Sequence, residues 1–168
     1  LDKLTISADR LSNNRREVFA QMAEEIKNSL EFLNMPFVTL ALSMEKKDFA
    51  PDGQDNIEFL ISANKGEMPK PLSKIASGGE LSRIMLAIKN VLAEKEDTHT
   101  LIFDEIDTGV SGSAAMKIGR LLKETSVGKQ VLCVTHSAQI AAFADNHLQI
   151  EKKTDENATF TSVRELHG

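Results

Sequence analysis

The run Leu101-Ile102-Phe103-Asp104-Glu105 joins three apolar residues to two adjacent carboxylates. Further along the chain, Val131-Leu132-Cys133-Val134 is a second unbroken apolar run, and Thr135-His136 follows it directly. Short continuous apolar runs are typical of parallel strands that are buried on both faces of a sheet. We therefore expect two buried parallel strands, each followed by polar residues at its carboxyl end.

Helical patterns precede, separate and follow these two runs. Before the first strand, apolar residues recur at the helical period at Leu81, Ile84, Met85, Ile88, Val91 and Leu92. Between the strands, a second set lies at Ala114, Ala115, Ile118, Leu121 and Leu122. Ser111 or Ser113 is expected to cap this second helix, Gly128 to end it, and residues 137–144 to form a short third helix. The order helix, strand, helix, strand, helix predicts a parallel α/β core.

The first 35 residues read as one long helix. Its apolar seam alternates steps of four and three residues, as in a heptad with one polar member, through Leu4, Ala8, Leu11, Arg15, Val18 and Met22. The helix is expected to weaken or restart at Ser12-Asn13-Asn14 and to end near Asn34 and Pro36. On pattern alone it is either an amphipathic surface helix or the root of a coiled coil that continues upstream. Because Leu1 opens on a helical pattern already under way, we expect a piece of a longer protein.

Strand-like segments flank the predicted core on both sides. Residues 37–42 and 57–61 are β-rich and are joined by a turn-rich segment, which predicts an antiparallel pair. Residues 65–74 contain two prolines and no periodicity, so we expect a loop there. Residues 147–166 are expected to form a closing hairpin with its turn at residues 154–157.

Composition limits the classes of function. The chain has 168 residues, 41% of them hydrophobic and 27% charged, which suits one soluble domain with a buried core. Its net charge of −5 excludes a binder of nucleic acid that is basic overall, so a DNA contact would need a local patch or another part of the protein. The single cysteine, Cys133, excludes an internal disulfide framework and fits a reducing cytoplasm. In an apolar strand it is expected to be a small buried residue and not a nucleophile. We expect neither a membrane span nor a signal peptide.

The polar residues after the two strands point to phosphate chemistry. Ligands of open parallel sheets bind at the carboxyl ends of the strands, so Asp104, Glu105 and His136 are expected to converge on one site. Asp104 is suited to hold hydrated Mg²⁺, and Glu105 to orient or deprotonate a water. His136 is suited to contact a γ-phosphate. Taken singly, each of these residues also has a structural explanation, as a turn cap or a structural histidine.

A glycine-rich segment, Ser77-Gly78-Gly79-Glu80, stands at the expected start of the first core helix. Two glycines there let the backbone approach an anion, and the free amides and the helix dipole favour phosphate. The alternative is a plain helix N-cap after a tight turn. No Gly-x-x-x-x-Gly-Lys-[Ser/Thr] occurs in the sequence, so this chain is not expected to hold a nucleotide by itself.

In their order along the chain, these motifs resemble those of the ABC ATPase superfamily. Ser77-Gly78-Gly79-Glu80 resembles its signature motif, Leu101-Ile102-Phe103-Asp104-Glu105 its Walker B strand, and Thr135-His136 its switch histidine. Ile106-Asp107 is similar to the structural-maintenance-of-chromosomes (SMC) branch of that superfamily. More narrowly, residues 75–83, 102–112, 134–136 and 139–141 resemble the RecN family of bacterial DNA repair ATPases.

This resemblance implies an α/β fold, namely the C-terminal lobe of an ABC/SMC-type ATPase head with a parallel sheet core, an antiparallel β pair and an N-terminal coiled-coil helix root. Residues 1–35 would be the returning arm of the coiled coil and residues 36–168 the lobe, completed by an N-terminal P-loop lobe of the same protein. The implied function is Mg²⁺-dependent ATP hydrolysis in recombinational repair of DNA double-strand breaks. Double-stranded DNA and a second copy of the protein would be its partners. The implied location is the bacterial cytoplasm, at the nucleoid.

The resemblance also implies roles for single residues. Two heads would sandwich two ATP molecules, and the signature residues Ser77, Gly78, Gly79 and Glu80 would contact the ATP bound to the other head. Asp104 would hold Mg²⁺ through water, Glu105 would be the general base, and His136 would sense the γ-phosphate. Asp107 and Ser111 would belong to the D-loop region beside the nucleotide.

The sequence departs from the family pattern at two points. Ser111 stands where many ABC ATPases have the D-loop aspartate, and Ser137-Ala138 stands where the repair family often has Leu-Pro. The alternatives are a head segment of another SMC or ABC ATPase, a catalytically silent interaction module, and a stand-alone magnesium hydrolase. The intact set Asp104, Glu105 and His136 argues against a silent module, and the missing P-loop argues against unaided hydrolysis.

Overall fold

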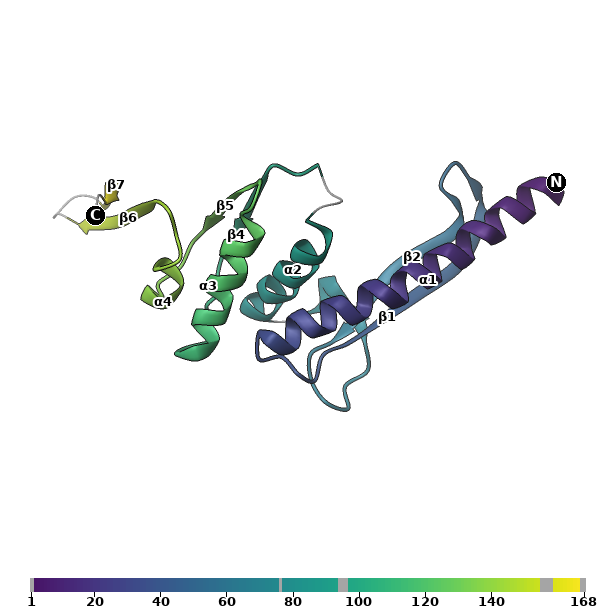
Figure 1. Ribbon diagram of the computed structural model, residues 1–168, viewed down its shortest axis with the longest axis horizontal. Coiled ribbons are helices and arrows are strands. Elements are labelled where there is room, and N and C mark those ends of the chain that lie inside the picture. The colour runs from purple at the N-terminus through teal and green to yellow at the C-terminus, as the bar shows by residue number, and fades with distance from the viewer. Residues whose placement is uncertain (1, 76, 94–96, 155–158, 167–168) are drawn as a thin grey trace.

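The computed structural model describes residues 2–75, 77–93, 97–154 and 159–166 (Figure 1). The elements before the core are α1 (Asp2–Phe32), β1 (Thr39–Ala50), β2 (Gly53–Ser62), β3 (Lys70–Pro71) and a 3₁₀-helix (Leu72–Lys74). The core and the closing hairpin consist of α2 (Gly78–Leu92), β4 (Thr100–Phe103), α3 (Ser113–Thr125), β5 (Gln130–Cys133), α4 (Ala138–Ala141), β6 (His147–Thr154) and β7 (Thr159–Leu166). Figure 1 shows α1 lying along the β1–β2 hairpin at one end of the molecule and β6 and β7 at the other end.

Helix α1 is continuous, so the break expected at Ser12-Asn13-Asn14 is wrong. Ser12 is buried, and its hydroxyl donates to the carbonyl oxygen of Ala8 at 3.0 Å, which keeps it satisfied inside the helix. The expected end of the helix is confirmed. Asn34 takes a left-handed conformation with φ of 61° just after the last helical turn, and asparagine tolerates this backbone geometry better than most residues.

The antiparallel pair predicted after α1 is confirmed, and its strands are longer than expected. β1 and β2 pair from Thr39↔Ser62 out to Ala50↔Gly53, so the hairpin extends far along α1. The expected loop over residues 65–74 is partly wrong, because β3 adds a short third strand to β2 at Leu60↔Pro71 and Ile61↔Lys70. Proline fits there, since an edge position does not require its missing N–H.

The predicted parallel pair is also confirmed, with β4 beside β5 in the register Leu101↔Val131 and Phe103↔Cys133. The expectation that both faces are buried is wrong. Leu101 and Phe103 are buried, whereas Ile102 on the opposite face of β4 is 69% exposed. An apolar run therefore marks a strand here without a covering layer on each side.

One apolar core joins the end of α1 to the helices and strands that follow. Leu30 and Leu33 of the α1 end pack with Val38 before β1, Ile84 of α2 and Ile118 of α3. Each such side chain contributes about 1.5–3 kcal/mol when it is fully buried. The C-terminal end of α1 is thus part of the same packed body as the parallel strands.

The later elements follow the expected order with one correction. Helix α3 has Gly112 at its N-cap with φ of 56° and no side-chain cap, so the expected capping by Ser111 or Ser113 is wrong. A glycine adopts this backbone conformation without the strain that a side chain would add. The β6–β7 hairpin is confirmed, while Asp155, Glu156 and Asn157 of its expected turn lie outside the described residues. Among the described residues, no helix is long and apolar enough to cross a membrane.

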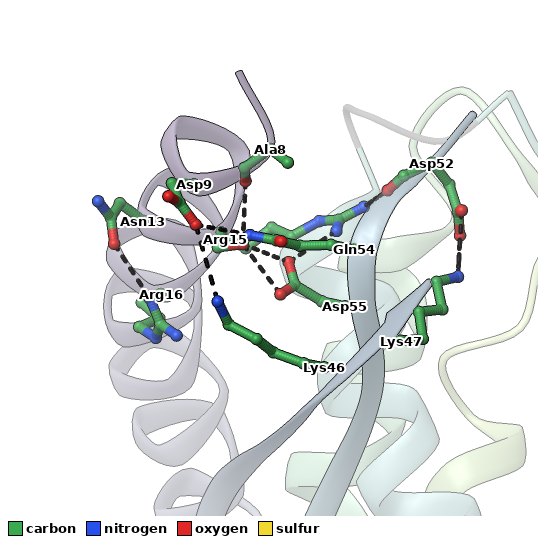
Figure 2. Close-up of polar contacts among 11 residues, drawn as sticks. Ala8, Asp9, Asn13, Arg15, Arg16, Lys46, Lys47, Asp52, Gln54 and Asp55 are labelled. Atoms are coloured by element: carbon green, nitrogen blue, oxygen red, sulfur yellow. Dashed lines mark hydrogen bonds and ion pairs between the residues drawn. The ribbon is translucent and has the colours of Figure 1, made fainter. Parts of the chain in front are cut away.

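A polar cluster holds the tip of the β1–β2 hairpin against α1 (Figure 2). The buried Asp55 carboxylate accepts hydrogen bonds from the Ser12 hydroxyl at 2.8 and 2.9 Å and from Arg15 Nη1 at 3.0 Å. Arg15 Nη2 also donates to the carbonyl oxygen of Asp52 at 2.6 Å. Burial raises the pKa of Asp55, but the hydrogen bonds from Ser12 and Arg15 outweigh it, so this pKa lies below its usual value.

We predict that Asp55→Ala lowers the free energy of unfolding by about 1–3 kcal/mol, because it removes the buried carboxylate that pairs with Arg15 and accepts from the Ser12 hydroxyl. Urea unfolding followed by circular dichroism measures the change. Asp48→Ala is the matched control, since Asp48 lies on the same hairpin and is exposed. Equal unfolding free energies for the two variants would contradict this role of Asp55.

The same pair of proteins has a predictable pH dependence. A folded-state pKa below the unfolded value means that the Asp55 contribution is present above the unfolded pKa and is lost as the pH falls through the folded one. The difference in unfolding free energy between wild type and Asp55→Ala is therefore expected to be constant near neutral pH and to shrink below about pH 4. A difference that grows on acidification would contradict the lowered pKa.

Candidate functional site at the strand ends

Helix α2 begins at the glycine-rich segment. Ser77 is its N-cap, with an extended backbone, and its hydroxyl oxygen accepts a hydrogen bond from the Glu80 backbone N–H at 3.3 Å. This geometry confirms the N-cap interpretation of Ser77. The capping role leaves the anion-binding interpretation open, because Gly78 is exposed at the positive end of the helix dipole.

The two glycines bring α2 into close contact with the turn that follows β4. A Cβ atom on Gly79 would lie 2.8 Å from the Thr108 Cβ and 2.9 Å from the Thr108 carbonyl oxygen. A Cβ atom on Gly78 would lie 2.5 Å from Oε2 of Glu105. Gly79 is therefore required for the approach of the helix start to residues 105–108, and the Glu105 carboxylate lies over Gly78.

Hydrogen bonds from the next turn of α2 fasten the same approach. The Ser82 hydroxyl donates to the carbonyl oxygen of Asp104 at 2.7 Å. Arg83 Nη1 donates to the carbonyl oxygens of Thr108 at 3.0 Å and of Ile106 at 3.4 Å. Burial lowers the pKa of the Arg83 guanidinium, and the nearby Glu80 carboxylate opposes that shift. An arginine nevertheless stays charged at neutral pH, so these are charge-assisted bonds.

The two predicted carboxylates are exposed at the end of β4. Asp104 Oδ1 accepts a hydrogen bond from the Glu105 backbone N–H at 2.9 Å, which orients the Asp104 side chain. Glu105 has φ of 56°, in the left-handed region that is costly for a residue with a side chain. Ile106 next to it is fully buried and pins the turn to the core. The strained turn thus presents Glu105 outward at a fixed place.

Asp107 faces the opposite way, into the protein. Its Oδ2 atom accepts hydrogen bonds from the Thr135 hydroxyl, from the His136 backbone N–H at 2.9 Å and from the Ser137 backbone N–H at 3.1 Å. Burial raises the pKa of Asp107, but these hydrogen bonds outweigh it, so the pKa lies below its usual value. The turn after β4 and the segment after β5 are therefore joined through one ionised carboxylate.

The expected convergence of Asp104, Glu105 and His136 takes a specific form. Because β4 and β5 are parallel neighbours, all three residues lie at one edge of the pair. The described contact of the His136 imidazole is with Asp107, at 3.1 Å from Nδ1 to Oδ2. Ser111 is exposed in the turn before α3, where its carbonyl oxygen accepts a hydrogen bond from the Ala114 N–H at 3.3 Å.

Sequence reasoning missed the residues that join the two motifs. Ser82, Arg83 and Thr108 carry the contact between α2 and the turn after β4. Their signal lay in the sequence, since Ser82 and Arg83 occupy the first turns of a helix that must pack beside the strand end. The pattern gave no reason to assign them a role.

The donor set at this edge fits a magnesium ion that is bound together with phosphate. Among the described residues, no group of three His, Cys, Asp or Glu side chains is arranged to hold a metal by itself. Mg²⁺ typically uses one or two carboxylates and completes its shell with water and phosphate oxygens, which an exposed Asp104 permits.

Burial raises the pKa of Cys133 to about 11, so this thiol stays protonated, as expected for a residue that is not a nucleophile.

We predict different effects on stability when alanine replaces each of the two neighbouring glycines. Gly79→Ala is expected to lower the free energy of unfolding by about 1–3 kcal/mol, because its methyl group meets the backbone and Cβ of Thr108. Gly78→Ala meets only the end of the Glu105 side chain, which can rotate away, so stability should change by less than about 0.5 kcal/mol. Urea unfolding of both variants checks this, and equal losses would contradict the close approach at Gly79.

Comparison with known proteins finds similarity to bacterial DNA repair proteins. No family model matches the chain. It is 42% identical to the DNA repair protein RecN of Halalkalibacterium halodurans, over 97% of this chain and 30% of that protein. It is 40% identical to the DNA repair protein RecN of Bacillus subtilis, over 97% of this chain and 31% of that protein.

Solved structures agree on the fold. An SMC head domain from Pyrococcus furiosus with an extended coiled coil, bound to a domain of ScpA, superposes with a TM-score of 0.61 at 18% identity, over 98% of this chain and 39% of that one. An SMC head domain with a coiled coil from Pyrococcus yayanosii gives a TM-score of 0.60 at 20% identity, over 95% of this chain and 30% of that one. Nearly the whole chain is therefore similar to a segment that spans about 30% of the length of the RecN proteins it matches, and it has the fold of part of an SMC head.

Proposed function

We propose that this chain is the C-terminal segment of an SMC-like ATPase head that acts in bacterial DNA repair. The observation that carries the proposal is the direct contact between the start of α2 and the turn after β4, which joins the signature-like glycines to the Walker B-like carboxylates. The relatives are DNA repair proteins by name. A further structural neighbour, with a TM-score of 0.52 at 21% identity, comes from work on ATP-driven dimerization and DNA-stimulated activation of SMC ATPases.

In this proposal the residues at the strand ends divide the work of ATP hydrolysis. Asp104 would hold Mg²⁺ through water, and the bound ion would neutralise charge on the phosphates. Glu105 takes a proton from the attacking water, and its carboxylate is exposed at the end of β4. His136 meets the γ-phosphate from the neighbouring strand end, where its side chain is 82% exposed.

The signature residues act on a different ATP molecule in this proposal. Ser77, Gly78, Gly79 and Glu80 contact the nucleotide that is bound to a second copy of the head, where free amides and the dipole of α2 attract the γ-phosphate. Ser111, exposed before α3, lies in the D-loop region at that interface. Support comes from the exposure of Gly78 at the N-terminus of α2, with Glu105 of the same chain beside it.

An N-terminal P-loop lobe of the same protein is the proposed partner of the open sheet face. Ile102 and Val134 leave the β4–β5 face apolar and exposed. Leu148, Ile150 and Val163 of the β6–β7 hairpin are also largely exposed. Exposed apolar surface on neighbouring strands is typical of a face that another layer covers.

The coiled-coil arm and DNA complete the proposal. Leu4 and Val18 are exposed on α1 and lie on one face of the helix, which suits pairing with a second helix over residues 1–35. Residues 1–35 and the lobe at residues 36–168 differ in their proposed roles. They do not form separate packing units, because the end of α1 packs into the common core. Double-stranded DNA as a partner and the bacterial cytoplasm as the location rest on the relatives, since the net charge of −5 supplies no basic surface overall.

We predict that Glu105→Gln in the full-length protein lowers the rate of ATP hydrolysis by about 10²–10⁴-fold, because it removes the general base. ATP binding should persist, since the amide has the same shape. Steady-state hydrolysis with and without linear double-stranded DNA, beside nucleotide binding, measures both. Glu58→Gln, an exposed glutamate on β2, is the control. Hydrolysis by Glu105→Gln at the wild-type rate would exclude Glu105 as the base, and an inert wild type would favour the silent interaction module.

A second prediction tests the proposed lobe interface. When this chain and the N-terminal part of the full-length protein are expressed as two pieces, they should purify together. Ile102→Glu should weaken the association by about 100-fold or more, because it buries an unpaired charge. Met116→Glu is the control, since Met116 is exposed on α3. Association of Ile102→Glu at wild-type strength would show that the open face of β4 is not the interface.

A further inference from the structure

The Asp107 carboxylate accepts several hydrogen bonds from one short segment of the chain. It is only 2% exposed, and its Oδ2 atom accepts from the hydroxyl of Thr135 and the backbone N–H groups of His136 and Ser137. The Thr135 hydroxyl oxygen in turn accepts from the Ser137 N–H at 3.0 Å. Thr135, His136 and Ser137, shortly after β5, thus all donate to one oxygen atom of the turn after β4.

The same oxygen atom also meets the imidazole of His136. Nδ1 lies 3.1 Å from Oδ2, while 82% of the His136 side chain is exposed. A ring whose Nδ1 lies against a buried carboxylate presents Nε2 outward, where it can meet a ligand. A carboxylate that fixes the orientation of a working histidine in this way is a recurrent device of active sites.

The place of Asp107 in the chain ties His136 to the proposed base. Asp107 is separated from Glu105 only by Ile106, which is fully buried and cannot shift without disturbing the core. The Thr108 N–H closes this turn by donating to the carbonyl oxygen of Glu105 at 3.1 Å. One short, pinned turn therefore presents Glu105 outward and holds His136 through Asp107.

We propose that Asp107 is a positioning residue, which holds the His136 ring with Nδ1 inward and Nε2 toward the phosphoryl group of the bound nucleotide. The inference rests on the proposed ATPase function and changes the role expected for Asp107 within it. Its carboxylate acts through His136 and does not contact the nucleotide itself. Glu105 and His136 keep their relative placement during turnover because one turn carries both.

A double-mutant cycle in the full-length protein tests this role. His136→Ala, Asp107→Ala and the double variant are compared with wild type by steady-state ATP hydrolysis. Each single variant is expected to lower kcat by about 10-fold or more, with a smaller change in KM, since an orienting partner commonly contributes that much. The double variant should be no slower than His136→Ala alone, because Asp107 has no ring left to position.

Two further variants separate positioning from a structural role. Asp107→Asn keeps an oxygen that can accept the same backbone N–H groups, so it should recover part of the kcat lost in Asp107→Ala. Asp145→Asn is the control, since this exposed aspartate pairs with Lys123 away from the strand ends. If Asp107→Ala does not fold, the same cycle is run with Asp107→Asn.

The outcomes separate this inference from the proposed function. Two results would overturn the positioning role alone, provided that the wild type hydrolyses ATP. One is a double variant whose loss in kcat equals the product of the two single losses, and the other is a wild-type kcat in a folded Asp107 variant. If the wild type itself does not hydrolyse ATP, the proposed ATPase function is wrong, and the positioning role is wrong with it. We expect Asp107→Ala to lower kcat in the presence of His136 and to cause no further loss in the His136→Ala background.

Discussion

The close approach of α2 to the turn after β4 is the constraint on which the site depends. Gly79 can have no side chain because Thr108 occupies that space. Ser82 and Arg83 then fix the approach by donating to backbone carbonyl oxygens of Asp104 and Thr108. Because these acceptors belong to the backbone, the start of α2 cannot move without moving the turn that carries Glu105. In the proposed dimer of heads, this contact links the nucleotide met by α2 to the nucleotide met by Glu105.

A second contact extends the link to the neighbouring strand. Asp107 binds the segment after β5 through Thr135, His136 and Ser137, so the two strand ends form one hydrogen-bonded unit. Its burial would disfavour the charged form, but the donors around Oδ2 outweigh that effect and keep the carboxylate ionised. At the end of the molecule formed by α1 and the β1–β2 hairpin, the Asp55 cluster holds the hairpin tip on α1 in a similar way. Both contacts use a buried carboxylate to join segments that are distant in sequence.

The spacing of the hydrophobic residues was enough to predict the order of the helices and of the strands other than β3. It also predicted the neighbouring strand ends, because buried positions repeat with the geometry of each element. It failed where a partner distant in sequence decides. The α1 helix continues through Ser12, whose buried hydroxyl has acceptors in the Ala8 carbonyl of its own helix and in Asp55 of the hairpin. The β4 run Leu101-Ile102-Phe103 looks buried on both faces, yet Ile102 is largely exposed among the described residues. The pattern Asp-Glu-Ile-Asp likewise does not reveal that Asp107 points inward, since its acceptor role appears only once β5 lies beside β4.

The most direct measurement of the central claim is complementation between two inactive full-length proteins. One carries Ser77→Arg, which blocks the signature end of α2, and the other carries Glu105→Gln. Mixed pairs then contain one complete site, made from the intact signature of one head and the intact base of the other. An equimolar mixture is predicted to recover about a quarter of the wild-type ATPase rate, because half of the random pairs are mixed and each has one complete site of two. A mixture that forms mixed dimers and stays as inactive as its components would contradict a site built from two heads.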